Sequence, residues 1–250
     1  MQEKLNIFSV SVDTAERKDI LQKMSDMLCG NSQNKIFTPN TEMLLAAKKD
    51  HRLADMLNSA ELLIPDGTGV KIASQILNSP LSERLSGIDL AAELLTIAAQ
   101  TENSVYLLGG KEGVAEAAAK NLKNLLPSLD ICGTHHGYFD KSGEENDRLL
   151  SDIRAAAPQI LFVCFGFPAQ ERWICENLTP TALPSVRIAM GLGGSLDVWS
   201  GNKKRAPKAL QAMGLEWLWR SAFEPKRLKI FLEIPKFLYF SLLERQRSIT

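Results

Sequence analysis

Short apolar runs alternate with longer stretches of helical periodicity through residues 1–200, and this alternation limits the possible folds more than any other feature of the sequence. The runs are almost continuously apolar, as expected of parallel strands that are covered on both faces. Repeated strand–helix units of this length are typical of an open, doubly wound α/β sheet. The sequence predicts strands at 35–38, 62–65, 104–108, 131–133, 160–165 and 186–190, and helices at 41–49, 68–77, 114–125, 144–156 and 170–177.

The strand signals stop near Gly201, and the charge of the chain changes at the same point. Residues 201–250 contain 11 Lys and Arg against 4 Asp and Glu, whereas residues 1–200 contain 18 against 25. We therefore predict an α/β core at 1–200 and a basic, aromatic, helical appendage at 201–250. Cations interleaved with aromatic side chains suit the surface of an anionic membrane, and they suit a solvated helix that closes a core equally well.

Attachment to a membrane is expected to be peripheral, because no stretch approaches the ~20 apolar residues that a spanning helix needs. No secretory signal peptide is visible at the N-terminus. The four cysteines lie far apart, with no CxxC pair and no histidine at ligand spacing. These features indicate a reducing cytoplasm and no structural metal site.

Polar or glycine-rich segments follow five of the predicted strands, at 38–41, 65–69, 109–113, 166–171 and 191–197. Ligands bind beyond the carboxyl ends of the strands in open α/β sheets, so these segments are expected to converge on one site. The glycine segment at 109–113 opens a helix, whose backbone N–H groups favour an anion. Neither a GxGxxG motif nor a GxxxxGK[ST] motif is present, which argues against a nicotinamide cofactor and against a P-loop.

Asp66 is the strongest single candidate for a catalytic residue. It lies between Pro65 and Gly67 at the end of a predicted strand. There it is placed either to accept a proton from an attacking hydroxyl or to cap the helix predicted at 68–77. No DxD sequence is present to hold a metal against a nucleotide diphosphate, so Arg or Lys would have to neutralise a departing diphosphate. The available cations are Arg84, Lys203, Lys204, Arg205, Arg220 and Arg227.

At these residues the chain resembles the WecG/TagA/CpsF family of bacterial glycosyltransferases. The resemblance extends from about residue 36 to residue 232, with the motifs of the family in the right order. The motifs are residues 38–40, 65–69, 83–90, 107–110, 166–171, 191–197, 205–207, 215–220 and 224–227.

Members of that family transfer a sugar, often N-acetylmannosamine, from a UDP donor to N-acetylglucosamine that is linked through diphosphate to undecaprenol. The resemblance implies a Rossmann-like core, no metal or other cofactor, and a β-1,4-linked disaccharide lipid that serves teichoic acid or other surface polysaccharide synthesis. It also implies that the appendage docks on the cytoplasmic face of the membrane and completes the active site. We expect an inverting transfer and no nucleic-acid partner; the donor sugar and a possible homo-oligomer stay open.

The resemblance assigns the catalytic base to Asp66, with Thr38 and Asn40 beside it. It also brings Gln170 to the donor diphosphate and Asp197 to the nucleoside. The predicted substrate-binding residues are Arg84, Gly109, Gly110, Gln170, Gly193, Asp197, Arg205, Arg220 and Arg227. Ile230 stands where the family often has arginine, so one phosphate contact is expected to be shifted or missing.

Two other functions fit the same residues. An Asp-dependent hydrolase of nucleotide sugars would use water in place of the acceptor. A membrane-peripheral, UDP-binding module without catalysis would use Asp66 merely to cap a helix. The cationic, aromatic appendage argues against both, because neither function needs it beside the site.

Overall fold

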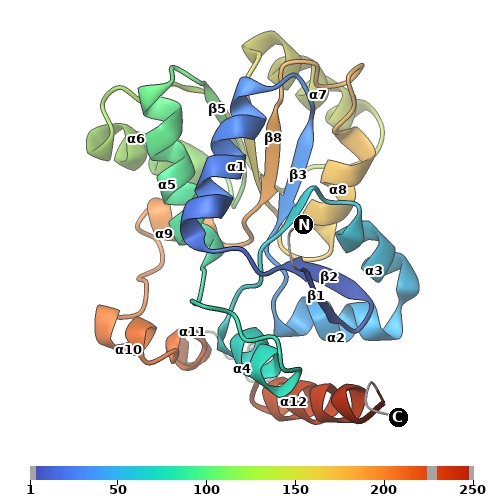
Figure 1. The fold of residues 1–250 in the computed structure, drawn as a ribbon. Coiled ribbons are helices and arrows are strands. Elements are labelled where there is room, and N and C mark those ends of the chain that lie inside the picture. Colours follow the sequence, from blue (N-terminus) through green and yellow to red (C-terminus); the bar gives the residue numbers. More distant parts are fainter. Residues whose placement is uncertain (1–3, 224–229, 248–250) are drawn as a thin grey trace.

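The computed structural model describes residues 4–223 and 230–247 (Figure 1). Within these residues, six parallel strands form one sheet in the spatial order β4–β3–β8–β7–β5–β6. The strands are β3 (Asn34–Phe37), β4 (Leu62–Leu63), β5 (Val105–Gly109), β6 (Ile131–His135), β7 (Ile160–Cys164) and β8 (Ile188–Gly191). The predicted doubly wound, Rossmann-like α/β sheet is confirmed.

Successive residues of each strand enter two different hydrophobic cores on opposite faces of the sheet. Ile36 and Leu107 belong to one core and their neighbours Phe37 and Leu108 to the other. The core that contains Ile36 is covered by α1 (Arg17–Cys29), α5 (Gly87–Gln100), α6 (Val114–Leu125) and α9 (Ser195–Trp199). The core that contains Phe37 is covered by α2 (Thr41–Lys49), α3 (His51–Asn58), α7 (Glu144–Ala156) and α8 (Ala169–Asn177), on the other face of the sheet (Figure 1). This burial on both faces explains why the strands are apolar without alternation.

The helices predicted at 41–49, 68–77, 114–125, 144–156 and 170–177 are all present, with bounds that differ by at most one residue. The long helices α1 and α5 are absent from the predicted set. The N-cap residue of α1 is Glu16, which is not a preferred capping residue, whereas that of α5 is Ser86, which is, so the start of α5 did carry a local signal.

The N-terminal segment forms a separate antiparallel hairpin of β1 (Lys4–Ile7) and β2 (Val10–Asp13). Its two-residue turn places Phe8 and Ser9 at φ values of 54° and 67°, a left-handed conformation that glycine or asparagine usually occupies. The turn therefore lacks the sequence signature of a hairpin. The buried edge of the sheet is covered by this hairpin, where the Asp13 carboxylate accepts a hydrogen bond from Leu63 N–H at 2.9 Å.

The C-terminal segment is helical, as predicted, and it folds back onto the core. It contains α10 (Lys208–Ala212), α11 (Glu216–Phe223) and α12 (Ile230–Arg247). The helix α12 packs against α2 and α4 (Thr68–Ile76), as Figure 1 shows. Phe237 of α12 is fully buried and meets Phe8 edge-to-face, with ring centroids 5.3 Å apart. Within the described residues, no helix combines the length and the apolar character that a membrane span requires.

The connections that leave β5 and β7 turn to opposite faces of the sheet. The helix α6 follows β5 on one face, and α8 follows β7 on the other. Since β5 and β7 are neighbours, a topological switch point lies between them. Ligands of open α/β sheets bind at such a point, beyond the carboxyl ends of the strands.

Candidate active site

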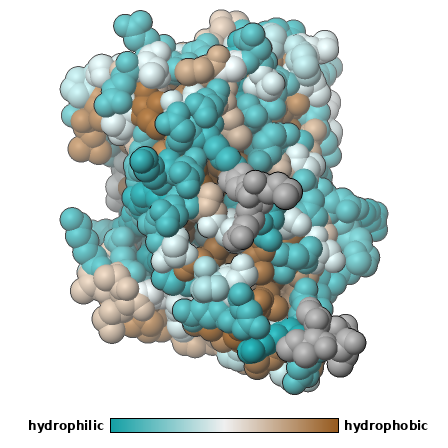
Figure 2. Space-filling model, in the orientation of Figure 1, coloured by the Kyte–Doolittle hydropathy of each residue, from teal (hydrophilic) through white to brown (hydrophobic). Residues whose placement is uncertain are grey.

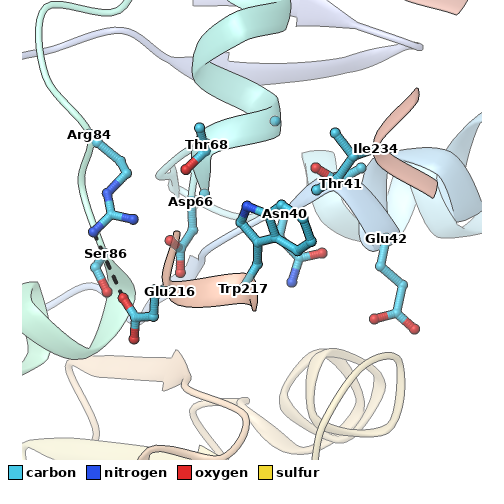
Figure 3. Close-up of a pocket in the computed structure, with 12 residues that line it drawn as sticks. Asn40, Thr41, Glu42, Asp66, Thr68, Arg84, Ser86, Glu216, Trp217 and Ile234 are labelled. Atoms are coloured by element: carbon cyan, nitrogen blue, oxygen red, sulfur yellow. Dashed lines mark ion pairs between the residues drawn. The ribbon is translucent and has the colours of Figure 1, made fainter. Parts of the chain in front are cut away.

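Two hollows open at the carboxyl edge of the sheet. The first, here called the Asp66 cavity, has a volume of about 130 Å³ and is shown in Figure 3. Its lining includes Asn40, Asp66 and Arg84 from the core and Glu216, Trp217 and Ile234 from the C-terminal segment. Residues of the core and of the appendage thus form one cavity.

Asp66 is held at the strand end by its backbone and faces the first turn of α5. Its N–H donates to Pro39 C=O at 3.0 Å, and its backbone forms an isolated parallel bridge with Leu85. The carboxylate oxygen Oδ2 accepts a long hydrogen bond of 3.4 Å from Gly87 N–H, at the first residue of α5. A helix N-terminus stabilises a carboxylate, and a bond of 3.4 Å is at the long end of the range for hydrogen bonds. The N-cap position of α4 is occupied by Gly67, with a φ of 97°, and not by Asp66.

Asn40 and Thr38 flank this position in different ways. The Asn40 side chain caps α2 by accepting a hydrogen bond from Met43 N–H at 3.1 Å, and it also lines the Asp66 cavity. Thr38 packs against the start of α5: a Cβ added to Gly87 would lie 3.0 Å from the Thr38 hydroxyl. The structure therefore brings Asn40 and Asp66 to one cavity, with Thr38 supporting the helix turn that Asp66 faces.

Four charged side chains join the core to the appendage in what we call the ion network: Arg84, Asp89, Arg205 and Glu216. Arg205 forms a bidentate pair with Asp89, in which Nη2 and Oδ2 are 2.7 Å apart. Glu216 lies 3.4 Å from Arg205 Nε. It also lies 3.8 Å from Arg84 Nη2, a pair that Figure 3 shows. The hydrogen bonds from Arg205 hold the pKa of Asp89 below its ordinary value, although burial opposes this, and Asp89 raises the pKa of Arg205.

The ion network connects the appendage to the core. Arg84 and Asp89 belong to the core, whereas Arg205 and Glu216 belong to the segment after Gly201. Glu216 begins α11, so fixing its carboxylate also fixes the neighbouring Trp217 over the Asp66 cavity. The guanidinium of Arg205 is engaged by two carboxylates in this arrangement, and its contact with a substrate stays a prediction.

The second hollow, here called the glycine crevice, has a volume of about 960 Å³ and lies at the switch point between β5 and β7. Its lining includes Gly110, Lys111, Tyr138, Lys141, Gly193 and Asp197. Gly109 ends β5 with a φ of 139°, and a Cβ there would lie 2.5 Å from the carbonyl oxygen of Cys164. Only glycine allows the ends of β5 and β7 to approach this closely, which shapes the floor of the crevice.

Cationic groups make the glycine crevice suitable for an anion. Lys141 Nζ donates to Gly137 C=O at 2.8 Å and lies 4.6 Å from the ring centroids of Phe139 and Phe165. Burial lowers the pKa of this ammonium. Lys203 pairs with Asp197 at 3.2 Å on the opposite wall. The N-terminus of α6 adds backbone N–H groups next to Lys111.

Gln170 and Glu171 lie beneath the crevice on the first turn of α8. Gln170 is 5% exposed, and its carboxamide oxygen accepts hydrogen bonds from the loops that follow β7 and β8. Glu171 is 0% exposed, and burial raises its pKa to about 7. The predicted contact of Gln170 with the donor diphosphate stays a prediction.

The sequence matches the WecG/TagA/CpsF family of glycosyl transferases over residues 5–249. The chain belongs to this family. Two similar proteins come from Staphylococcus aureus, strains MRSA252 and NCTC 8325 / PS 47, and each is named N-acetylglucosaminyldiphosphoundecaprenol N-acetyl-beta-D-mannosaminyltransferase. Each is 34% identical to this chain, over 238 and 240 residues, in alignments that cover 94% of this chain and 91% of the relative. The protein is a hexosyltransferase.

The family motifs divide between the two hollows. Asn40, Asp66 and Arg84 line the Asp66 cavity, whereas Gly110, Gly193 and Asp197 line the glycine crevice. Arg220 lies in α11, but its side chain is outside the description, and Arg227 lies outside the described residues. Within residues 4–223 and 230–247, no three His, Cys, Asp or Glu side chains are grouped to hold a metal ion.

Three residues of the site are missing from the predicted set: Glu216, Glu171 and Lys141. Glu216 and Glu171 belong to family motifs at 215–220 and 166–171, so the motifs themselves were the available signal. Lys141 lies in the turn after β6, where no motif of this sequence singles it out.

The ion network predicts that Asp89→Asn loosens the appendage. Asparagine keeps the shape of the side chain and removes its charge, so Arg205 loses its bidentate partner. Because both side chains are partly exposed, we expect the docking of the appendage on the core to weaken by about 1 kcal/mol. The rate of tryptic cleavage within residues 201–250 should then rise about fivefold.

The matched control is Glu93→Gln, on the same helix, whose carboxylate pairs with Arg17 of the core. That variant should be cleaved at the parent rate. Equal cleavage of the parent and Asp89→Asn would show that the pair does not hold the appendage.

Burial of Glu171 predicts a pH-dependent gain in stability for Glu171→Gln. The pKa of this carboxyl is raised from 4.5 to about 7 on folding, so ionisation favours the unfolded chain as the pH rises through this range. Glutamine carries no such penalty. The free energy of unfolding of the variant, relative to the parent, should therefore increase from pH 5 to pH 8 by up to about 3 kcal/mol. Urea titration at both pH values measures this difference, and a difference that does not change with pH would refute the raised pKa of Glu171.

Proposed function

We propose that the protein transfers N-acetylmannosamine, or a closely related sugar, from a UDP donor to N-acetylglucosaminyl-diphospho-undecaprenol, with inversion at the anomeric carbon. The observation that carries this proposal is the placement of the Asp66 cavity beside the glycine crevice. The loop after β3 lines the cavity, the loop after β8 lines the crevice, and β3 and β8 are neighbours in the sheet. The product would be a β-1,4-linked disaccharide lipid, an intermediate of teichoic acid or another surface polysaccharide.

The glycine crevice is the proposed donor site. Its volume suits a nucleotide sugar, and its lysines and the α6 N-terminus suit the diphosphate. Tyr138 is 71% exposed at the crevice, where its ring is free to stack on a base, and Asp197 on the facing wall is placed to accept hydrogen bonds from the nucleoside.

The Asp66 cavity is the proposed place of reaction. The Asp66 carboxylate takes the proton of the acceptor C4 hydroxyl while that oxygen attacks C1 of the donor sugar. The bond between C1 and the diphosphate oxygen breaks, and UDP leaves with the electron pair. Lys111, Lys141 and the arginines of the appendage would stabilise the negative charge of the departing diphosphate.

The appendage is the proposed membrane contact. Figure 2 shows hydrophobic surface over the lower part of the molecule, where α4, α10 and α12 lie. Large apolar residues are exposed in α4, α11 and α12 and directly after α10: Ile72, Met213, Leu218, Phe231, Leu232, Tyr239 and Leu242. The exposed cations Lys208, Lys236 and Arg245 lie on the same helices. Apolar and cationic groups together suit the inner face of an anionic membrane, where a lipid-linked acceptor would be met.

The first test is Asp66→Asn. Loss of a positioned base should lower the rate of transfer by about 10²- to 10⁴-fold while the affinity for UDP stays within about twofold of the parent. The reaction is followed by mass spectrometry of products from a panel of UDP-sugars with a short-chain lipid diphosphate acceptor.

The control is Glu42→Gln, which neutralises another carboxylate of the same cavity. It should keep a rate close to that of the parent, and near-normal turnover by Asp66→Asn would remove Asp66 from the role of base. Sugar release without lipid acceptor would instead indicate a nucleotide-sugar hydrolase. Binding of UDP without turnover of any donor would indicate a binding module.

The second test addresses the membrane contact with Leu232→Asp. Leu232 of α12 is 78% exposed, and burying a leucine in a bilayer interface contributes about 2 kcal/mol, so we expect at least about tenfold weaker binding to phosphatidylglycerol-containing vesicles. Binding of the parent should also weaken as salt is raised.

The matched control is Leu125→Asp, which changes an equally exposed leucine (76%) at the end of α6. It introduces the same charge on the core and should leave vesicle binding unchanged. Equal losses in both variants would mean that the added charge, and not the face of α12, is responsible.

A further inference from the structure

One buried side chain connects two walls of the glycine crevice. Gln170 Oε1 accepts hydrogen bonds from Gly193 N–H at 2.8 Å and from Gly166 N–H at 3.2 Å. Gly166 follows β7 and Gly193 follows β8, and both line the crevice. Both glycines have positive φ values, 88° and 53°, so the loops adopt a conformation that local preferences of other residues would not maintain.

The orientation of the Gln170 carboxamide is set by its neighbour. Gln170 Nε2 donates to Glu171 Oε1 at 2.7 Å, and the Glu171 side chain is fully buried. The two ends of a carboxamide have the same shape but opposite hydrogen-bonding roles. A flipped amide would point its NH₂ group at two backbone N–H groups, and the acceptor on Glu171 favours the orientation in which the oxygen faces them.

The surrounding backbone leaves room for this side chain in one place. A Cβ added to Gly191 would lie 2.9 Å from Gln170 Nε2 and 3.3 Å from Cδ. The end of β8 therefore has to be glycine for the carboxamide to reach both loops. The amide at position 170, the acceptor at position 171 and the glycine at position 191 thus depend on one another.

We propose that Glu171 is a positioning residue for glycosyl transfer, which acts through Gln170 to hold the loops at Gly166 and Gly193 in the shape that receives the donor diphosphate. This inference rests on the proposed function, because it takes the ligand of the crevice to be a UDP-sugar. The second oxygen of Glu171 has no hydrogen-bond partner among the described residues, so a neutral carboxyl suits this position better than a carboxylate. A neutral carboxyl still accepts the Gln170 hydrogen bond.

The experiment compares Glu171→Gln, which retains an acceptor oxygen, with Glu171→Leu, which removes it at similar volume. UDP affinity is measured by calorimetry, and the KM values for donor and acceptor and kcat are measured on the full chain. Loss of the hydrogen bond that orients the amide should raise the Kd of UDP and the donor KM by about tenfold in Glu171→Leu, with the acceptor KM within about twofold. Glu171→Gln should stay within about threefold of the parent in each.

A matched control separates this role from general support of α8. Asn177 lies on the same helix and is also buried, but its amide bonds with Asn146 and with the Trp173 carbonyl, away from the crevice. Asn177→Ala should lower the melting temperature and leave the donor KM unchanged. If Glu171→Leu behaves in the same way, Glu171 is structural and the inference is wrong.

Two further outcomes are distinguishable. Should Glu171→Leu fail to fold, Gly191→Ala displaces the Gln170 amide directly and is expected to raise the UDP Kd by a similar factor; an unchanged Kd in that variant overturns the inference. A parent protein that binds no UDP would refute the proposed function itself, and this inference with it. A parent that binds UDP while every variant binds it equally well would refute the inference alone.

Discussion

The parallel pairing of all six strands is the constraint on which the remaining structure depends. Parallel strands bury both faces, so their side chains are committed to packing, and Ile36 and Phe37 in adjacent positions serve different cores. Chemistry is therefore confined to the segments beyond the strand ends. Because the strands are parallel, these segments lie at one edge, and the reversal of connections between β5 and β7 opens the crevice there.

The edge of the sheet is completed by residues from the other end of the chain. The ion network attaches Arg205 and Glu216 to Arg84 and Asp89, and α12 inserts Phe237 beside Phe8. A half-buried, bidentate arginine–carboxylate pair has directional geometry as well as charge, so it restricts both the distance and the orientation between the two segments that it joins. Trp217 and Ile234 consequently close a cavity whose floor is made by the first half of the core.

Much of this architecture could be predicted from local sequence. The strand–helix units could be predicted, because burial on both faces leaves uninterrupted apolar runs. Parallel pairing then predicts that the polar segments after the strands lie at one edge of the sheet. The hairpin could not, since Phe8 and Ser9 occupy turn positions without the residues that usually mark them. The Asp89–Arg205 pair spans 116 residues, and the raised pKa of Glu171 depends on burial; neither has a local signature.

The uneven distribution of charge has two separate consequences. Arg205 of the appendage is directed inward and forms a half-buried pair with Asp89. Lys203 pairs with Asp197 on the wall of the crevice but is exposed, as are Lys208 and Lys236. Exposed charges are screened over about 8 Å at physiological ionic strength, whereas half-buried pairs are screened much less. Added salt is therefore expected to weaken any attraction of the exposed lysines to an anionic surface more than it weakens the Asp89–Arg205 pair that joins the appendage to the core.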